Sequence, residues 1–378
     1  MKTFQKITLK RTCASLLCAA IACAPWIAGA TPEHQSYTVT NLIADTPGIA
    51  ANTDTNLINA WGTVDPSGNL FITENGSQQV EFFLADGTPL DFSINATGGP
   101  SGIIFNSGTN DFKIGTGSNA VSAALLIATE SGTILGFNLA NNPNTAVVVV
   151  DRSASNSVYK GVATARAFGR EILYATDFHN GRIDGFDSQF NYLGSFTDPR
   201  VPAGFAPFNI RNIEGLLYVT FAKQLLPDKH DDQAGPGNGF VDIFAPEGFV
   251  VRRLIEQGHL NSPWGLALAP GNFGRFSYSL LVGNFGDGVI NAYDPFTGRF
   301  LGSLNDSSNK PIVLQGLWAL DFAPAAGDSD GDGDFDRDDP LAVLYFSSGP
   351  GSENHGLVGA IMSVTKPAKR HNLGIPGQ

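Results

Sequence analysis

The hydrophobic and polar positions of this 378-residue chain alternate in short blocks. From Tyr37 onward, apolar runs of strand length are separated by turns rich in Gly, Asn, Asp, Ser and Pro, and no helical period persists over about ten positions. The clearest example is the segment WGTVDPSGNLFITENG, in which a turn joins two apolar runs, 61–64 and 70–73. A third run, 79–84, follows the next turn. This pattern predicts an all-β protein built from short strands.

The same order of strands and turns returns five more times along the chain. The six repeats begin near residues 61, 100, 161, 207, 264 and 317, and intervals of about 40 to 60 residues are typical of propeller blades with loop insertions. One such unit cannot bury both faces of its sheet, whereas six arranged radially can. We therefore predict a six-bladed β-propeller in which an N-terminal strand at 36–41 joins the last blade beside 356–364 and closes the ring. A β-sandwich or two stacked barrels is the alternative.

Short motifs in these repeats resemble those of known propellers. One motif reads Pro/Trp-x-Gly-Ile/Leu, and the strand after it ends in Asp, Glu or Asn plus Gly. This motif is similar to the NHL repeat. The segments NLIADTPGIAANTDTNLINAWG, GNGFVDIF and SPWGLALAP also resemble an uncharacterised bacterial secreted family described as PEP-CTERM-associated hypothetical proteins. This resemblance implies an NHL-like propeller and no particular activity. Unlike that label, the polar tail at 366–378 has no apolar sorting segment.

The first thirty residues read as an export signal. Four basic residues precede an apolar stretch at 14–24, and the small residues at 28–30 supply a cleavage pattern. An uncleaved anchor and a lipoprotein signal ending at Cys23 are the alternatives, although the apolar stretch is too short for a permanent span. All three cysteines lie inside this signal, so no disulfide is expected. We predict a periplasmic or extracellular protein with one propeller domain at 31–365 and no membrane span after cleavage.

Composition narrows the classes of function. The formal net charge is −12, and removal of the signal leaves a still more acidic chain, which disfavours binding to nucleic acid or anionic lipid. Six histidines and two methionines leave few ligands for haem or copper. The sequence contains no His-Glu-x-x-His motif, Walker loop or dinucleotide fingerprint. The expected partner is a protein, a glycan or a small molecule, bound by a monomer.

An insertion at 327–339 carries the clearest chemical signal, because its acids follow the spacing of a calcium loop. Carboxylates occupy loop positions 1, 3, 5, 7, 9 and 12, with Gly333 at position 6, and they belong to Asp328, Asp330, Asp332, Asp334, Asp336 and Asp339. Alternate side chains and one carbonyl can then surround a single Ca²⁺ ion. The last acid is Asp rather than Glu, and strands rather than helices flank the loop. We predict a structural calcium ion here, the alternative being a solvated acidic insertion in the sixth blade.

A second polar cluster lies in the fourth repeat. Its members are Asp228, His230, Asp231 and Asp232, and the carboxylates beside His230 can orient its ring. We interpret the cluster as a ligand or metal site on one face of the ring, with a mobile surface loop as the alternative.

Two recurring features are given structural roles. Acids and amides recur where the second strand of a repeat ends, at Glu74, Glu130, Asp177, Asn284 and Glu353. We attribute them to turn chemistry rather than to a ring of catalytic acids. Trp61, Trp264 and Trp318 begin equivalent repeats and are expected in the core, with an aromatic lining for sugars as the alternative.

These observations favour an exported binding or scaffold module with a calcium-stabilised loop. The alternative is a metal-dependent, gluconolactonase-like hydrolase with a site in the central channel, for which the candidate side chains are Asn59, Asn209, Asn261 and Asp321. A weaker alternative is a polysaccharide-active enzyme, for which the candidate bases are His179, His230 and His355.

Overall fold

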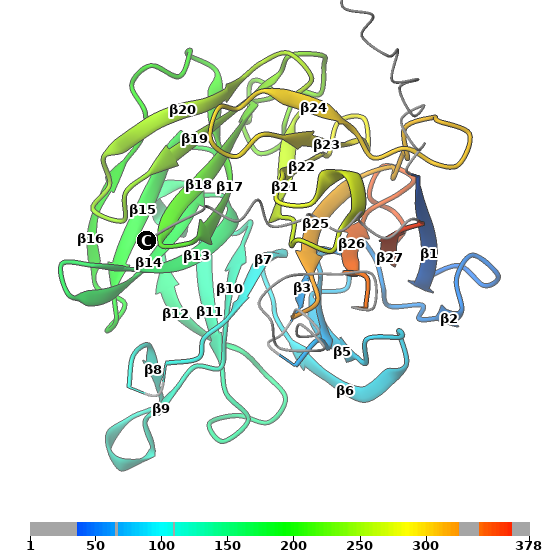
Figure 1. The fold of residues 1–378 in the computed structure, drawn as a ribbon. Coiled ribbons are helices and arrows are strands. Elements are labelled where there is room, and N and C mark those ends of the chain that lie inside the picture. Colours follow the sequence, from blue (N-terminus) through cyan, green and yellow to red (C-terminus); the bar gives the residue numbers. More distant parts are fainter. Residues whose placement is uncertain (1–35, 65–66, 109, 325–339, 365–378) are drawn as a thin grey trace, which may run out of the picture. The chain divides into compact units, whose positions relative to one another are not determined.

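Six β-sheets follow one another in chain order around a common centre (Figure 1). The computed structural model describes residues 36–64, 67–108, 110–324 and 340–364. Each sheet is an antiparallel meander that runs outward from an inner strand, apart from one short parallel strand at the edge of the last sheet. The inner strands of neighbouring sheets contact one another around the ring. The structure is therefore the predicted six-bladed β-propeller rather than a sandwich or a pair of barrels.

Five of the blades are four-stranded sheets of consecutive strands. Blade one comprises β3 (Thr63–Val64), β4 (Leu70–Glu74), β5 (Gln79–Phe83) and β6 (Pro89–Asn95). Blade two comprises β7 (Pro100–Phe105), β10 (Leu125–Thr129), β11 (Thr133–Phe137) and β12 (Val147–Asp151). Blade three comprises β13 (Tyr159–Ala167), β14 (Arg170–Asp177), β15 (Arg182–Asp187) and β16 (Tyr192–Phe196). Blade four comprises β17 (Phe205–Ile213), β18 (Leu216–Lys223), β19 (Gly239–Phe244) and β20 (Val250–Glu256). Blade five comprises β21 (Pro263–Leu268), β22 (Leu280–Asn284), β23 (Ile290–Tyr293) and β24 (Phe300–Ser303).

Blade six is completed by the N-terminal strand, as predicted. Its own strands are β25 (Leu317–Phe322), β26 (Leu344–Ser348) and β27 (Leu357–Ser363), and β1 (Tyr37–Ala44) pairs antiparallel with β27. The register places Tyr37 opposite Ser363 and Ala44 opposite Leu357. The short strand β2 (Asn52–Thr53) adds to β1. Backbone hydrogen bonds between the two ends of the domain thus close the ring.

Each pair of neighbouring blades encloses its own hydrophobic core. In β14, Leu173 and Ala175 pack toward blade two, whereas Ile172 and Tyr174 pack toward blade four. Successive side chains of a strand point to opposite faces, and here both faces are buried. This is why inner and middle strands such as β10 read as nearly continuous apolar runs instead of alternating ones.

The outer strands are the part that the sequence pattern missed. Only three strands were predicted in each repeat, and β6, β12, β16, β20 and β24 add the fourth. They lie at the rim, where side chains such as Tyr192 and Leu193 are exposed, so their hydrophobic signal is weak. A hairpin of β8 (Lys113–Ile114) and β9 (Val121–Ser122), inserted in blade two, was also missed.

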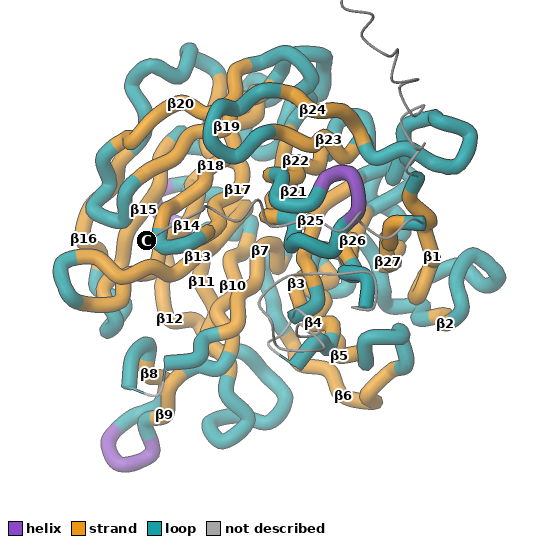
Figure 2. Tube along the Cα trace, in the orientation of Figure 1, coloured by secondary structure: helices purple, strands orange, loops and turns teal. Residues whose placement is uncertain are grey.

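Helical structure in the described residues amounts to three single 3-10 turns (Figure 2). They are η1 (Gly117–Asn119), η2 (Ser153–Ser155) and η3 (Gly274–Phe276). Within that described part, no helix has the length and apolar character needed to cross a membrane.

Candidate functional site

A β-bulge recurs near the start of the inner strand in blades two to six. In each of these strands the pairing with the second strand contains one extra residue, and a bulge redirects the side chain that it carries. In three blades, the backbone N–H of the residue after the bulged side chain donates a hydrogen bond to a hydroxyl of the second strand. The pairs are Gly161 with Thr176 Oγ1, Asn209 with Thr220 Oγ1 and Ala319 with Ser347 Oγ. The bulged segments contain Ser101, Lys160, Phe208, Trp264 and Trp318.

Aromatic side chains from three of these positions, together with Trp61 and Phe285, fill the centre of the ring. Trp61 and Trp318 stack with ring centroids 3.6 Å apart, and Trp264 packs edge-on to Trp61 at 5.1 Å. Phe208 and Phe285 pack against Trp318 from two sides. All three tryptophans are at most 5% exposed, so the prediction that they belong to the core is confirmed. We call this group the tryptophan plug.

Lys160 breaks the aromatic pattern. It stands in the bulge of β13, where three other blades have Phe or Trp, and its side chain is only 3% exposed. Its Nζ lies 5.9 Å from the Trp61 ring centroid, and its carbonyl accepts a hydrogen bond from Trp264 Nε1. A side chain on the next residue would not fit, because a Cβ on Gly161 would lie 2.4 Å from Asn209 Oδ1. Tight packing of the inner strands therefore fixes the lysine beside the plug.

Two carboxylates pair with this buried ammonium. Lys160 Nζ is in close contact with Glu130 Oε1, and Asp231 Oδ1 lies 3.5 Å away. Glu130 Oε2 also accepts a hydrogen bond of 2.8 Å from Asn75 Nδ2. Burial alone would raise the pKa of Glu130, but Lys160 lowers it overall, and the same carboxylates raise the pKa of Lys160 despite its burial. Both members of the pair therefore remain charged at neutral pH.

A third carboxylate reaches the same place from blade six. Glu353, in the β26–β27 turn, accepts a 2.7 Å hydrogen bond from Asn59 Nδ2, and Asn59 Oδ1 accepts the indole N–H of Trp318 at 2.7 Å. Burial raises the pKa of Glu353, and Lys160 partly opposes that effect. Asn59 thus connects this acid to the tryptophan plug.

His230 completes the group on its exposed side. Its Nδ1 lies 2.8 Å from Asp231 Oδ1, and the two side chains are 44% and 65% exposed. This hydrogen bond raises the pKa of His230 and holds that of Asp231 at about 2. We define the Lys160 site as Glu130, Lys160, His230, Asp231 and Glu353.

The structure brings part of the predicted polar cluster to this site. His230 and Asp231 belong to it, whereas Asp228 is exposed and offers its backbone carbonyl to His179 Nδ1. Asp232 is half-buried, and burial raises its pKa. A ligand role for this segment remains a prediction.

The acids at the ends of second strands divide into two groups. Asp177 accepts hydrogen bonds from Ser157 and Asn180, which is the predicted turn chemistry. Glu130 and Glu353 instead extend to the Lys160 site, so that explanation is incomplete for them. The six aspartates of the predicted calcium loop lie outside the described residues, between β25 and β26.

The residues considered for a channel metal make internal contacts. Asn209 Nδ2 donates to the Trp264 carbonyl, Asn261 Nδ2 donates to Asp287, and the Asp321 carboxylate pairs with Arg211. At the Lys160 site, by contrast, Glu130, His230 and Asp231 each offer a ligand atom within 4.8 Å of the others. The ammonium of Lys160 already contacts both carboxylates, and a divalent cation there would meet its repulsion. These residues therefore fit a divalent cation poorly while Lys160 is charged.

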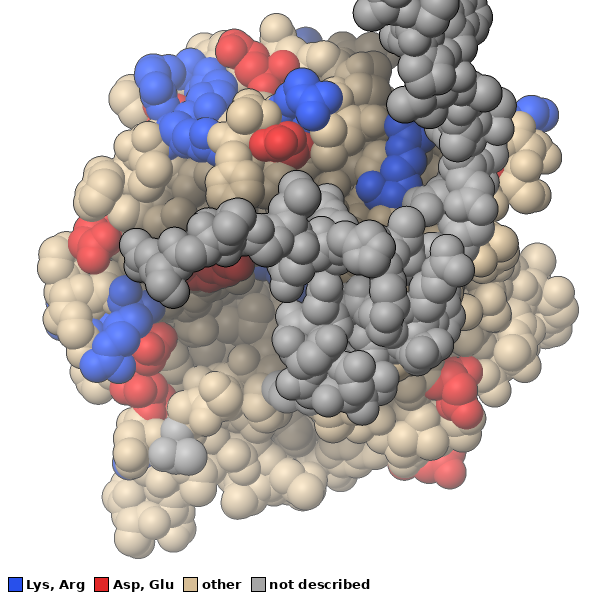
Figure 3. Space-filling view, viewed as in Figure 1, with Lys and Arg blue, Asp and Glu red and all other residues tan. Residues whose placement is uncertain are grey.

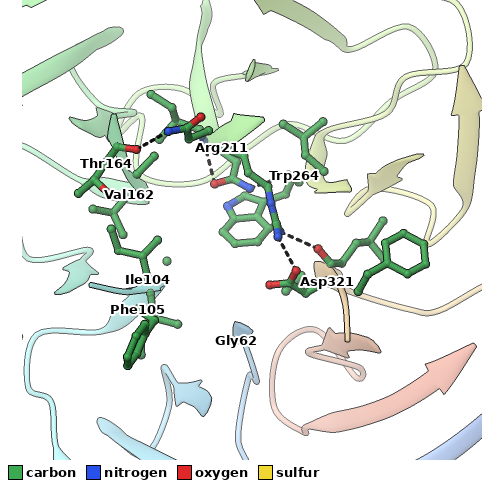
Figure 4. Close-up of a pocket in the computed structure, with 18 of the residues that line it drawn as sticks. Gly62, Ile104, Phe105, Val162, Thr164, Arg211, Trp264 and Asp321 are labelled. Atoms are coloured by element: carbon green, nitrogen blue, oxygen red, sulfur yellow. Dashed lines mark hydrogen bonds and ion pairs between the residues drawn. The ribbon is translucent and has the colours of Figure 1, made fainter. Parts of the chain in front are cut away.

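The other end of the channel holds a cavity of about 490 Å³ (Figure 4). Its wall comes from the later residues of the inner strands, and Gly62, Trp264 and Ala319 line it next to the plug. Arg211 extends from β17 to β25, where it donates to the Leu320 carbonyl at 3.0 Å and pairs with Asp321. The tryptophan plug thus separates a mixed-polarity cavity from the Lys160 site.

Charged side chains on the described part of the face in Figure 3 are sparse. Near β20, Lys and Arg side chains lie beside Asp and Glu side chains. Among the residues of β20, Arg253 pairs with both Asp198 and Asp242.

Sequence reasoning missed Lys160, Glu130 and Glu353 as partners. One signal was available: the dipeptides Trp61-Gly62 and Trp264-Gly265 align with Lys160-Gly161, so a lysine replaces an aromatic residue in the third repeat. Nothing comparable in the sequence connects Glu353 to Lys160.

Comparison with known proteins shows the relatives of this chain. A mimivirus protein called Uncharacterized protein L690 is 32% identical over 342 residues, covering 86% of each chain. A second mimivirus protein, Uncharacterized protein R648, is 30% identical over 341 residues, covering 86% of this chain and 80% of the relative.

One solved structure, of a protein of unknown function from Bacteroides thetaiotaomicron, shares the fold. The TM-score is 0.50 at 10% identity, over 86% of this chain and 76% of that one. No family model matches the chain, so its resemblance to NHL repeats and to the PEP-CTERM-associated group stays a prediction. The identity to L690 and R648 over most of all three chains shows that this six-bladed β-propeller belongs to the same family as these two mimivirus proteins.

Proposed function

We propose that the protein is an exported binding propeller whose ligand contacts the Lys160 site and carries hydrogen-bond donors but no negative charge. The observation that supports this is the surplus of carboxylates around one buried lysine. Glu130, Asp231 and Glu353 come from three different blades, and Lys160 and His230 are the basic groups among them.

Stability alone is a poor explanation for this arrangement. A buried ion pair contributes little net stability, because the loss of hydration offsets the attraction. The other bulges show that Phe or Trp can occupy the place of Lys160 and extend the aromatic core. A lysine held there by acids from separate blades is better explained by a requirement for polar groups at this surface.

The exposed atoms define the ligand chemistry. Asp231 and Glu353 present carboxylate oxygens, which accept hydrogen bonds from hydroxyl or ammonium groups. An anionic ligand would meet a site in which acids outnumber lysine, so it is repelled. Neutral saccharides and polyamines both carry such hydrogen-bond donors, and binding measurements distinguish these two classes of ligand.

The test is calorimetric titration of the full chain with a neutral oligosaccharide, a polyamine and an anionic oligosaccharide. The double variant Asp231→Asn/Glu353→Gln removes two charges with little change in shape. We expect it to weaken binding of the neutral or cationic ligand by at least about tenfold, since each charged hydrogen bond contributes about 1.5–3 kcal/mol.

The matched control is Glu247→Gln, which removes an exposed charge in the β19–β20 turn. It should bind like the unmodified protein. Preference for the anionic ligand, or equal binding by the double variant, would refute the proposal.

A metal-dependent hydrolase is the second candidate, supported by the proximity of Glu130, His230 and Asp231. It requires Lys160 to move or to lose its proton when metal binds. Zinc titration of Lys160→Met and of the unmodified protein tests this requirement. Equal, tight binding to both would favour the hydrolase, whereas binding confined to the variant would count against it.

A further inference from the structure

A separate group of acids lies between blade one and the N-terminal segment that closes the ring. Asp54 follows β2, Glu74 is the last residue of β4, and Glu81 lies in β5. Glu74 has no contact with the Lys160 site; its neighbour Asn75 makes that connection instead, through Glu130. The three acids therefore form a second polar centre.

Their carboxylates are held close together. Each offers an oxygen within 4.8 Å of the others. The side-chain amide of Gln79 donates to Glu74 Oε2 at 2.7 Å and to Glu81 Oε1 at 2.8 Å, and Ser77 Oγ donates to Glu74 Oε2 at 2.8 Å. Neutral donors thus position the acids without cancelling their charge.

Glu74 supplies an independent sign that a ligand is missing. Its side chain is completely buried, and Oε1 has no hydrogen-bond partner among the described residues. An unsatisfied buried carboxylate oxygen is costly. Within the described ranges, no Lys or Arg pairs with any of the three acids. A bound cation would satisfy the oxygen and neutralise the charges together.

We infer that Asp54, Glu74 and Glu81 bind a hard divalent cation of the calcium type. Carboxylate oxygens are the ligands that such ions prefer, at about 2.3–2.6 Å, so small side-chain movements bring the three oxygens into range. Rotation of the Gln79 amide would present its oxygen in place of the N–H, and water would supply the remaining ligands.

The site would tie the ring-closing segment to blade one. The backbone N–H of Asp54 donates to the Ala44 carbonyl at the end of β1, and Ser77 Oγ donates to the Asn56 carbonyl at 2.6 Å. A cation bound to Asp54 and to β4 and β5 would strengthen this connection. Its expected effect is therefore structural, independent of the ligand proposed for the Lys160 site.

The experiment measures bound calcium and the midpoint of thermal unfolding in the full chain. Three variants are compared with the unmodified protein: Glu74→Gln/Glu81→Gln, the loop variant Asp332→Ala/Asp336→Ala, and the control Asp86→Asn. The control removes an exposed acid from the β5–β6 turn of the same blade. Each is measured in calcium and in chelator.

The Glu74→Gln/Glu81→Gln variant should lose one calcium per chain and its thermal response to calcium. The control and the loop variant should keep the calcium bound by Asp54, Glu74 and Glu81. In both, calcium should still raise the midpoint of thermal unfolding by at least about 2 °C. In chelator, the double variant should be no less stable than the unmodified protein, since neutral amides relieve the repulsion. Retention of that calcium by the double variant, or no calcium response in the unmodified protein, would overturn the inference.

Discussion

The two ends of the central channel are built from the same six inner strands, yet they differ in chemistry. One end carries the Lys160 site, where loops of separate blades bring acids to a buried lysine. The other end is a cavity whose lining mixes apolar and polar side chains, among them the Arg211–Asp321 pair. The tryptophan plug lies between them.

This difference shows how a symmetric scaffold acquires one distinct site. The bulge is repeated in five blades, so it fixes where a side chain enters the channel but not which one. Lys160, which replaces an aromatic residue in one blade, places a buried positive charge there, and this charge requires carboxylate partners. Acids in the loops of blades two and four supply the negative charge, through Glu130 and Asp231.

Removal of an aromatic ring from the plug should have the largest effect. Trp318→Ala takes away the stacking partner of Trp61 and leaves a cavity between the two ends, so we expect the free energy of unfolding to fall by about 3–5 kcal/mol. Urea denaturation measures it. The control Phe296→Ala, at a side chain that is 80% exposed, should change stability by about 0.5 kcal/mol or less. Equal losses in both variants would contradict a structural plug.

Loss of the buried lysine should have the next largest effect. Lys160→Met leaves Glu130 charged and unpaired, and because Glu130 is 17% exposed we expect a loss of about 2–4 kcal/mol. Adding Glu130→Gln should restore most of it, as denaturation of the single and double variants will show.

The other end of the channel provides the comparison for this variant. Arg211 is 36% exposed whereas Lys160 is 3% exposed, and Asp321, itself only 12% exposed, lines the cavity. Water from the cavity can therefore hydrate Asp321 when the arginine is lost. Arg211→Met should therefore cost less than Lys160→Met. A larger cost at Arg211, or no recovery in the double variant, would contradict the distinction between the two ends.

The smallest expected effect concerns pH. Because Asp231 raises the pKa of His230 in the folded state, the pair contributes stability below the ordinary pKa of histidine, about 6.5, and loses it as pH rises through the folded-state pKa. Asp231 stays ionised throughout, since its pKa is about 2. The exposed pair should contribute at most about 1 kcal/mol. NMR titration of the His230 ring should show its pKa falling in Asp231→Asn.

Asp228→Asn is the matched control, since it removes a nearby charge without touching the His230 hydrogen bond. Its His230 titration should stay as in the unmodified protein. The same pKa in both variants would mean that general charge, rather than the Asp231 contact, sets the titration.

Most of the architecture could be predicted because its signals are local. Apolar runs mark the inner and middle strands, since both faces of those strands are buried, and turns mark the boundaries. The ring closure by β1 could be predicted because a strand pattern at 36–41 precedes the first full repeat and is free to join the last one. Outer strands such as β16 escaped because their exposed side chains remove the apolar signal.

The candidate site was predictable only in part. His230 and Asp231 are adjacent in sequence, and their pairing is a short-range property. Lys160, Glu130 and Glu353 are separated by long stretches of chain, and each looks ordinary in its own repeat.

The sequence by itself determined the repeated blades, because strand formation depends on neighbouring residues and on burial that each repeat encodes in the same way. Tertiary structure decided which polar side chains meet. The radial arrangement brings loops of different blades to one end of the channel, where the cost of burying Lys160 is offset only by acids that the fold places within contact distance.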